Sequence, residues 1–572
     1  LYIHGPSHHR AISSKRAAGV LLPAAEIFHT VEGLLAGHFN DYPEERLNKA
    51  WAASIYDDHG WGGNQGQITD QLFRSKLDFA AREGETLLQA ATAKTSGRIR
   101  FNRKLGQPIV VFNALSWQRS DPVWCTIRRQ GPYRIVDQNG VTVLHQVLAA
   151  EPGQPLDEER IVFFAKEVPS VGYRVYYVAS AEATKSVVKR TAENTEVYEN
   201  PFYKIYLSPG GIRQIFDKQL QKAILHEGGL LGAELFTMQS VGNGAGEFND
   251  VQQPTMEGFD QASRHQPVWR ISANGPVCTQ FTLRVALSGC TAVETLTVFN
   301  DRKQIDCDLS LLDWDGTPYR EFRLAWPLEM TGGQVSYEVP MAVVTVGQDE
   351  IAGAAGHAYG SLTYSVACKD VHPREVQNFI SASDDRFGVT LSSSVAVCDY
   401  VDPTDAQNAC PVLQPVLLAS RKSCHANGNW YLQEGDHHYH FSLFSHAPGW
   451  SNGYRLAVQA NHRLTPVLSA PAAADASLPE MESFCELSSA NVVLTTLKKC
   501  EDDDRIILRC VDMEGQDSRT AVRLFLPLAS AKRTNIIEEE GEALTVTDHS
   551  VMMPVGHHAI ETIKCTPARS QR

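Results

Sequence analysis

The spacing of apolar residues changes near Gly97, and this change limits the fold more than any other feature of the sequence. Before Gly97, apolar residues recur every three or four positions, which is typical of helices that bury one face. We expect helices from about Ile12 to Gly37, from Pro43 to Ile55 and from Gln67 to Ala93. The inward positions expected in the third helix are Ile68, Leu72, Ala80, Leu87, Leu88 and Ala91. Three such helices joined by short loops predict a small bundle.

After Gly97 the apolar residues alternate with other residues in short runs, and this period of two predicts β-strands. The runs include Pro108 to Phe112, Val171 to Val178, Phe202 to Leu207, Thr295 to Phe299, Leu324 to Trp326 and Val522 to Leu526. Hairpin turns are expected at Asn139-Gly140, Pro209-Gly210-Gly211, Asn427-Gly428 and Asn452-Gly453. These runs and turns predict packed antiparallel sheets, as in β-sandwiches.

The predicted fold class is therefore mostly β with an N-terminal α-helical bundle: a three-helix bundle followed by antiparallel β-sandwich domains. A chain of 572 residues suggests three or four domains at about 150 residues each. We expect the helical bundle at 1–96, a small β-sandwich at 97–185, a large β-sandwich domain at 186–465 and a C-terminal β domain at 466–572. The polar segments Ala181 to Asn194 and Ala470 to Glu482 are the candidate linkers.

Composition and charge narrow the class of protein. The 43% share of hydrophobic residues is enough for compact cores, and the formal net charge of -14 argues against a nucleic-acid binder. No run of apolar residues approaches the roughly 18 that a membrane span needs, and no signal-peptide pattern opens the chain. The twelve cysteines include no C-x-x-C pair, which favours buried thiols. The sequence has no N-x-[ST] glycosylation acceptor, which favours a cytoplasmic protein.

The segment Tyr56 to Gly66 concentrates residues that could carry chemistry between the second and third helices. His59 offers an imidazole for zinc, Asp58 a carboxylate beside it, and Trp61 an indole that suits the apolar face of a sugar ring. The neighbouring glycines allow the backbone to approach a ligand closely. The alternative is structural: the aspartates cap the start of a helix while Trp61 packs on the bundle.

Two further histidine groups have both a chemical and a structural interpretation. The opening segment Tyr2 to Arg10 holds three histidines, which could line a site but are more typical of a polar loop before a helix. In the run from Gly435 to Phe441, alternation places His438 and His440 on one face and His437 on the other. Such spacing can bring two imidazoles to one metal, although a solvated strand face is the commoner outcome.

A serine-hydrolase motif is present but lacks its expected surroundings. Residues 449–453 read Gly-Trp-Ser-Asn-Gly and satisfy G-x-S-x-G. A nucleophile elbow needs a strand before the serine and a helix after it. Since Asn452-Gly453 predicts a hairpin turn and Tyr454 to Val458 a strand, we set the motif aside.

Several segments resemble glycoside hydrolase family 38, the zinc-dependent α-mannosidases. Val110 to Trp117 (Val-Val-Phe-Asn-Ala-Leu-Ser-Trp) resembles the family's Val-Phe-Asn-Pro-Leu-Ser-Trp strand. The other similar blocks, in the family's order, are Glu199 to Tyr203, Gly210 to Ile212, Asp217-Lys218, Asp313-Trp314, Ala325 to Leu328, Tyr337 to Pro340 and Gly435 to His446. Their order over most of the chain is the specific signal.

The resemblance implies a catalytic α/β barrel, then a three-helix bundle, then β-sandwich domains, of which this chain matches the last two. The chain starts at Leu1 rather than Met, so we expect it to be part of a longer protein. The family's catalytic carboxylates and most zinc ligands lie in the barrel, and none is recognisable here. His59 occupies the place of the bundle's zinc ligand, although Gly60 replaces the Asp that usually follows; Asp58 and Trp61 are candidates for sugar contacts.

The implied activity is that of a retaining α-mannosidase acting on mannose-containing oligosaccharides or glycosides. No catalytic residue is assigned within the chain, so this polypeptide alone is expected to be inactive. The family often forms oligomers, which makes a homo-oligomer an expectation. The competing hypothesis is a non-catalytic carbohydrate-binding or scaffold protein built of β-sandwiches.

Overall fold

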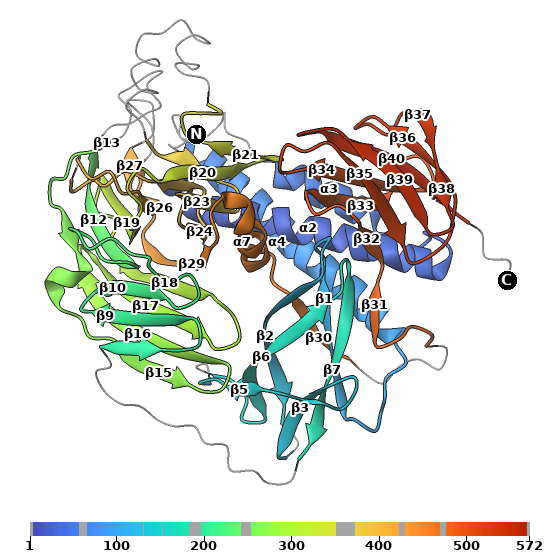
Figure 1. Cartoon of the computed structure of the whole chain (residues 1–572), viewed down its shortest axis with the longest axis horizontal. Coiled ribbons are helices and arrows are strands. Elements are labelled where there is room, and N and C mark those ends of the chain that lie inside the picture. The colour runs from blue at the N-terminus through green and yellow to red at the C-terminus, as the bar shows by residue number, and fades with distance from the viewer. Residues whose placement is uncertain are drawn as a thin grey trace, which may run out of the picture. The chain divides into compact units, whose positions relative to one another are not determined.

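The structure is a computed structural model that falls into two compact units (Figure 1). It describes residues 4–55, 66–129, 131–150, 153–181, 196–241, 253–350, 372–405, 407–422, 430–469 and 476–568. Unit 1 consists of residues 1–16, 55–78 and 188–461, and unit 2 of residues 17–54, 79–187 and 462–572. The division of the sequence into four domains stays a prediction.

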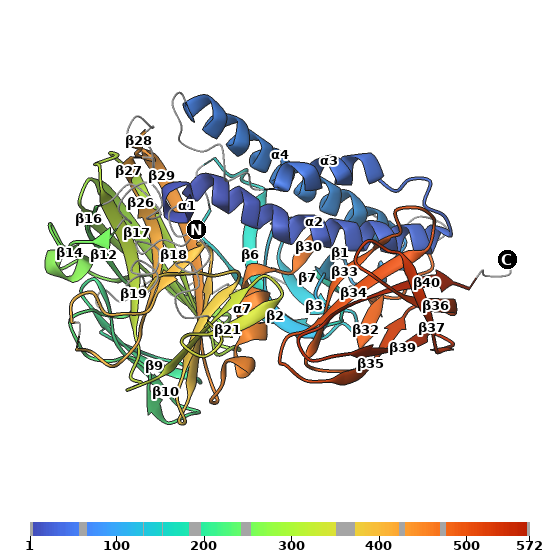
Figure 2. The same cartoon turned by 90° about the horizontal axis from the view of Figure 1, so that it is seen from above.

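The three predicted helices are present as α2 (His9–Ala36), α3 (Glu44–Ser54) and α4 (Gly66–Gly97), after a short α1 (His4–Ser7). Gly37 follows α2 with φ of 77°, the left-handed conformation that ends helices. Within unit 2 the helices lie beside one another (Figure 2) and share a contact made mostly of alanines, which allows close approach. The residues of this contact are Ala18, Leu22, Ala50 and Ala80.

The inward face expected for the third helix is correct at four of its six positions. Ala80, Leu87, Leu88 and Ala91 are buried, whereas Ile68 is 72% exposed and Leu72 58% exposed. Ile55, the residue at which the second helix was expected to end, is 68% exposed. Helical spacing identifies an apolar stripe, but the part of the stripe that is covered depends on which elements pack against it.

Unit 1 is a β-sandwich whose sheets are antiparallel throughout, as predicted. The largest sheet has nine strands in the order β15-β16-β17-β18-β29-β24-β23-β20-β21. A seven-stranded sheet (β13-β12-β19-β26-β25-β22, with β14 beside β12) and a four-stranded sheet (β11-β10-β9-β8) contribute to the same core. That core includes Trp314 and Trp326, which are almost fully buried.

The three runs predicted in unit 1 coincide with β9 or lie inside the longer strands β17 and β19. The strand bounds are β8 Val197–Glu199, β9 Tyr203–Ser208, β10 Gly211–Asp217, β11 Lys222–Ala223, β12 Glu234–Val241, β13 Gln253–Pro254, β14 Asp260–Gln261, β15 Arg270–Asn274, β16 Cys278–Leu287, β17 Cys290–Phe299, β18 Ile305–Trp314, β19 Arg320–Pro327, β20 Gln334–Val339, β21 Ala342–Thr345, β22 Arg374–Glu375, β23 Phe379–Ser383, β24 Gly388–Ser393, β25 Val397–Asp399, β26 Val412–Ala419, β27 Arg421–Lys422, β28 Trp430–Tyr431 and β29 Gly435–His446. Gly210 makes the tight turn between β9 and β10 with φ of 83°.

Unit 2 holds two further pairs of sheets. A sheet of order β30-β1-β7-β3-β4, with β31 beside β7, shares an apolar cluster with the three-stranded sheet β2-β6-β5. The sheets β32-β35-β39-β38 and β33-β34-β40-β36-β37 form the C-terminal sandwich. The bounds are β1 Gln107–Asn113, β2 Arg119–Arg128, β3 Tyr133–Asp137, β4 Thr142–Val143, β5 His145–Val147, β6 Glu158–Val168, β7 Gly172–Ser180, β30 Thr465–Leu468, β31 Met481–Ser483, β32 Cys485–Leu487, β33 Val492–Lys499, β34 Ile506–Asp512, β35 Ser518–Leu524, β36 Leu528–Thr534, β37 Glu540–Leu544, β38 Val546–Thr547, β39 Ser550–Val555 and β40 Ile560–Pro567.

The prediction for residues 452–458 is wrong. Trp450–Asn452 form a short 3-10 helix, and Tyr454–Asn461 form the helix α7 rather than a strand. Gly453 has φ of -114° and ψ of -26°, so it does not adopt the left-handed conformation of a two-residue hairpin turn. Tyr454, Ala457 and Val458 are all buried, and this spacing of three and four residues is helical.

One helix in the described part of the chain, α2, is long and apolar enough to cross a membrane by length and composition alone. This departs from the expectation that no such segment exists. However, 56% of its most apolar window is buried inside the structure, as in the core helix of a globular protein.

Candidate functional site

The site predicted from the sequence lies outside the described residues. Asp58, His59 and Trp61 belong to the segment 56–65, between the end of α3 and the start of α4. Their roles as sugar contacts and zinc ligand therefore stay predictions. Among the residues that are described, no group of three or more His, Cys, Asp or Glu side chains could hold a metal ion.

The alternation predicted for β29 is confirmed, and it separates the histidines by face. His437 and Tyr439 are buried, whereas His438 is exposed and His440 half-buried. His440 Nδ1 lies 2.8 Å from Asp308 Oδ1, and His438 Nδ1 lies 2.9 Å from Ser310 Oγ, both on the neighbouring strand β18. Each imidazole thus has a protein partner of its own, and the two do not form a metal site.

The opening segment is not a polar loop, because residues 4–7 form α1 and α2 begins at His9. His8 and His9 are buried, at 7% and 6% exposure. The His9 ring packs on Tyr439 with centroids 4.3 Å apart, and its backbone N–H donates to Gln433 Oε1 at 2.9 Å. His9 thus anchors the start of α2 against β29.

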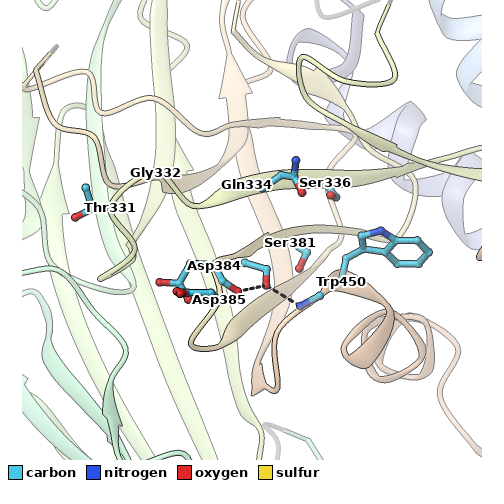
Figure 3. Close-up of a pocket in the computed structure, with 10 residues that line it drawn as sticks. Thr331, Gly332, Gln334, Ser336, Ser381, Asp384, Asp385 and Trp450 are labelled. Atoms are coloured by element: carbon cyan, nitrogen blue, oxygen red, sulfur yellow. Dashed lines mark hydrogen bonds between the residues drawn. The ribbon is translucent and has the colours of Figure 1, made fainter.

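A polar cavity of about 510 Å³ lies in unit 1, where three separate parts of the chain meet (Figure 3). One wall is the turn before β20 and the start of that strand, another is the hairpin between β23 and β24, and the third is the connection from β29 to α7. The lining residues are Thr331, Gly332, Gln334, Ser336, Ser381, Ser383, Asp384, Asp385, Gly449 and Trp450.

Some of these groups build the walls of the cavity. The Gly449 N–H donates to Ser383 Oγ at 2.7 Å and links the β29–α7 connection to the hairpin. Asp384 accepts the N–H groups of Arg386 and Phe387 at 2.8 and 3.0 Å, and also the Arg386 Nε at 2.7 Å. The Arg386 guanidinium and the backbone N–H groups lower the pKa of Asp384 against the opposing effect of its burial.

Other groups remain available to a ligand. Within the described part of the chain, the polar side-chain atoms of Gln334, Asp385 and Trp450 have no hydrogen-bond partner. Trp450 is half-buried, and its ring packs against Tyr454 with centroids 5.6 Å apart and planes at 67°. The cavity therefore presents a free carboxylate, a free amide and an indole.

No sequence pattern indicated this cavity, because its walls come from three separate segments, at 331–336, 381–385 and 449–450. The nearest signal was the G-x-S-x-G match at 449–453, whose surroundings were predicted wrongly. The motif does follow the strand β29 and precede the helix α7, yet Ser451 is not in the strained positive-φ conformation. Both ring nitrogens of the nearby His446 are bonded elsewhere, to Thr390 Oγ1 and Ala447 O, each at 2.8 Å. A serine nucleophile is thus not formed.

A second cavity, of about 340 Å³, lies in unit 2, and the charged side chains that line it form ion pairs with one another. Arg98 Nε lies 3.1 Å from Glu32 Oε2, and Lys94 Nζ lies 3.7 Å from Asp41 Oδ2. His29 Nε2 donates to the Leu87 carbonyl at 3.1 Å. These pairings make this cavity a weaker candidate than the one in unit 1.

Two polar residues of the family-like blocks, Asn113 and Asp217, stabilise turns. Asn113 donates to the carbonyls of Trp117 and Pro169, both at 2.8 Å, and accepts the Leu115 N–H at 3.0 Å. Asp217, which is fully buried, accepts the N–H groups of Gln219 and Leu220 at 2.9 Å. Buried polar groups of this kind must be paired, which explains why they form recognisable patterns.

Comparison with known proteins connects the fold to one family. Residues 491–563 match the model of the glycosyl hydrolases family 38 C-terminal beta sandwich domain. A search of curated protein sequences finds no match. The chain is similar to a solved protein of glycosyl hydrolase family 38 from Enterococcus faecalis, with a TM-score of 0.75, 14% identity and coverage of 98% of this chain and 70% of that one. It is equally similar to an alpha-mannosidase from Enterococcus faecalis V583, at 14% identity and a TM-score of 0.75, covering 98% of this chain and 68% of that one.

These findings confirm the resemblance to a C-terminal portion of family 38. Residues 491–563 match the model of the family's C-terminal sandwich, and 98% of the chain has a fold similar to part of two solved family 38 proteins. At 14% identity the structural likeness establishes the fold, and activity and substrate remain to be proposed.

Proposed function

We propose that this chain provides the helical and β-sandwich part of an α-mannosidase, a retaining glycoside hydrolase that acts on α-linked mannosides. The observation that carries the proposal is the agreement of 98% of the chain with the fold of family 38 proteins, one of them described as an alpha-mannosidase. The ordered sequence blocks and the match at 491–563 support it independently. We propose a cytoplasmic location, which the ten described cysteines support because all are free thiols.

The catalytic carboxylates are proposed to lie outside the described part of the chain. A retaining hydrolase needs a nucleophile and an acid about 5 Å apart across the scissile bond. The described units consist of helices and antiparallel sandwiches, and each solved relative extends beyond the part that this chain matches. The chain alone is therefore expected to be inactive.

The test is hydrolysis of an aryl α-mannoside by the purified 572-residue chain, compared with a longer polypeptide in which a family 38 barrel precedes Leu1. We expect turnover only with the longer polypeptide. If the chain alone hydrolyses the substrate and an α-mannosidase inhibitor stops that hydrolysis, the proposal that the catalytic carboxylates lie elsewhere is contradicted. Absence of turnover with both would contradict the proposed activity.

Zinc remains part of the proposal, with His59 as one ligand. The described residues do not by themselves form a zinc site, and a catalytic zinc takes about three protein ligands, so the others would have to come from elsewhere. When bound, zinc would hold sugar hydroxyls and orient the ring.

His59→Ala in the longer polypeptide is expected to lower bound zinc, measured by elemental analysis, together with turnover. His557→Ala, at an exposed position in unit 2, is the matched control. Unchanged zinc content in the His59 variant would exclude it as a ligand. The competing hypothesis of a non-catalytic sugar-binding or scaffold protein predicts no turnover in any of these polypeptides.

A further inference from the structure

We propose that the cavity between β20, the β23–β24 hairpin and the β29–α7 connection binds a neutral sugar ring. Its three unpartnered side chains, Gln334, Asp385 and Trp450, are the groups that would recognise the ligand. None of them belongs to the segment expected to serve hydrolysis, and the inference does not depend on that activity.

The chemistry of the lining favours a polyhydroxylated, uncharged ligand. A carboxylate such as Asp385 accepts hydrogen bonds from hydroxyl groups, and charge-assisted bonds of this kind are about twice as strong as neutral ones. The Gln334 amide can donate and accept, and the Trp450 indole N–H can donate. The indole also offers an apolar surface for the C–H face of a sugar ring.

Other classes of ligand fit less well. An anion would meet two carboxylates, Asp384 and Asp385, in a lining that contains no Lys or Arg. Calcium requires about six to eight oxygen ligands, whereas the Asp384 oxygens are already bonded to Arg386 and to backbone N–H groups. An apolar ligand would leave the hydroxyl, amide and carboxylate groups without partners.

Size and rigidity also suit a sugar. A volume of about 510 Å³ falls within the range of roughly 300–1,000 Å³ that is common for small-molecule sites. The walls are fixed by the bond from Gly449 to Ser383 and by a buried chain of bonds behind them, in which Thr390 Oγ1 donates to Ser381 Oγ at 2.9 Å. A wall that is held in place before binding costs less conformational entropy on binding.

The test is titration of the purified chain with methyl α-mannoside, methyl α-glucoside and mannotriose, followed by calorimetry and tryptophan fluorescence. At least one saccharide is expected to bind with a Kd below about 10 mM. Asp385→Asn and Trp450→Ala are each expected to weaken that binding about tenfold, which corresponds to about 1.4 kcal/mol. Asp504→Asn, at an exposed site in unit 2, is the matched control and should bind like the parent chain.

No saccharide binding, or binding that Asp385→Asn and Trp450→Ala leave unchanged, would overturn the proposal. A calcium chloride titration in which calcium binds and Asp385→Asn removes that binding, with no saccharide bound, would replace it with a cation site. Should Trp450→Ala fail to fold, Gln334→Ala supplies the second substitution. Because the readout is binding by the chain alone, its failure is distinguishable from failure of the hydrolysis test.

Discussion

The imidazole rings of His9 and His437 lie with their centroids 5.4 Å apart in unit 1. Burial, followed by the charge of His437, lowers the pKa of His9 to about 3. Burial lowers the pKa of His437 to about 4, and the nearby Arg10 adds to this effect. His437 Nε2 donates to the Gln433 carbonyl at 2.5 Å, while its buried Nδ1 has no partner. The folded chain therefore favours the neutral form of both rings.

This pair predicts a loss of stability in mild acid. The pKa of a histidine in the unfolded chain is about 6.5. As the pH falls below that value, the unfolded chain binds protons at these two histidines and the folded chain does not, so the unfolded state is favoured. The stabilising contribution is complete above pH 6.5 and is lost as the pH falls toward 4. Between pH 6.5 and 5 each histidine should cost about 2 kcal/mol of unfolding free energy. Urea denaturation across this range should show a shallower slope for His437→Gln, with His557→Gln as an exposed control. Equal slopes in both variants would contradict the prediction.

Glu338 predicts a pH dependence of the opposite sign. Burial raises the pKa of Glu338 to about 7, although the Asn378 N–H bond at 2.9 Å and the charge of Arg16 oppose the shift. The folded chain thus holds a proton that the unfolded chain releases near pH 4.5, and stability is lost as the pH rises from 4.5 to 7. Glu338→Gln keeps a carbonyl acceptor without the charge, so it should gain about 2 to 3 kcal/mol at pH 8 and little at pH 4. Thermal unfolding at both pH values measures this, with the exposed Glu257→Gln as control. A loss of stability at pH 8 would exclude this account.

Arg323 predicts a large cost for removing one buried charge. Its Nε lies 2.5 Å from Glu321 Oε1, and its Nη1 lies 2.7 Å from Asp399 Oδ2 and 3.1 Å from Gln414 Oε1. Arg323→Met fills similar space but leaves two buried carboxylates without their cation. Breaking a buried pair in this way typically costs about 3–5 kcal/mol. Urea midpoints should show the loss, whereas the exposed Arg284→Met should change stability by less than about 0.5 kcal/mol. Similar urea midpoints for the two variants would mean that the ion pairs of Arg323 contribute little to stability.

Two glycines of unit 2 predict opposite effects of the same substitution. A Cβ on Gly172 would lie 2.1 Å from the Glu482 carbonyl oxygen, between the paired strands β7 and β31. Gly172→Ala should therefore destabilise the unit by more than about 2 kcal/mol, since the strands would have to separate. Gly19 lies on the exposed side of α2, and a Cβ there meets nothing within 4 Å. Gly19→Ala should stabilise by about 0.5–1 kcal/mol, because alanine has the higher helix propensity. Melting temperatures would show both effects, and a stabilised Gly172→Ala would contradict the packing.

Local patterns in the sequence determined the elements of this protein and their class. The change of period at Gly97, the end of the first helix near Gly37 and the alternation of β29 each depend on neighbouring residues, and each is confirmed. The error at Tyr454 to Val458 has the same origin, because a run of five residues fits a strand and a helix equally well. Only its packing against the sheet, through Tyr454, Ala457 and Val458, selects the helix.

Tertiary structure alone decided what the chemically reactive residues do. His9 and His437 are 428 positions apart in the sequence, yet their rings meet in the folded chain, where burial lowers the pKa of both. Asp385 and Trp450 line one cavity because Asp385 precedes β24, Trp450 follows β29, and these two strands pair in the same sheet. A sequence pattern reports which residue types are present and which face of an element they share, whereas burial and long-range pairing determine whether a group is neutral, charged or free to bind.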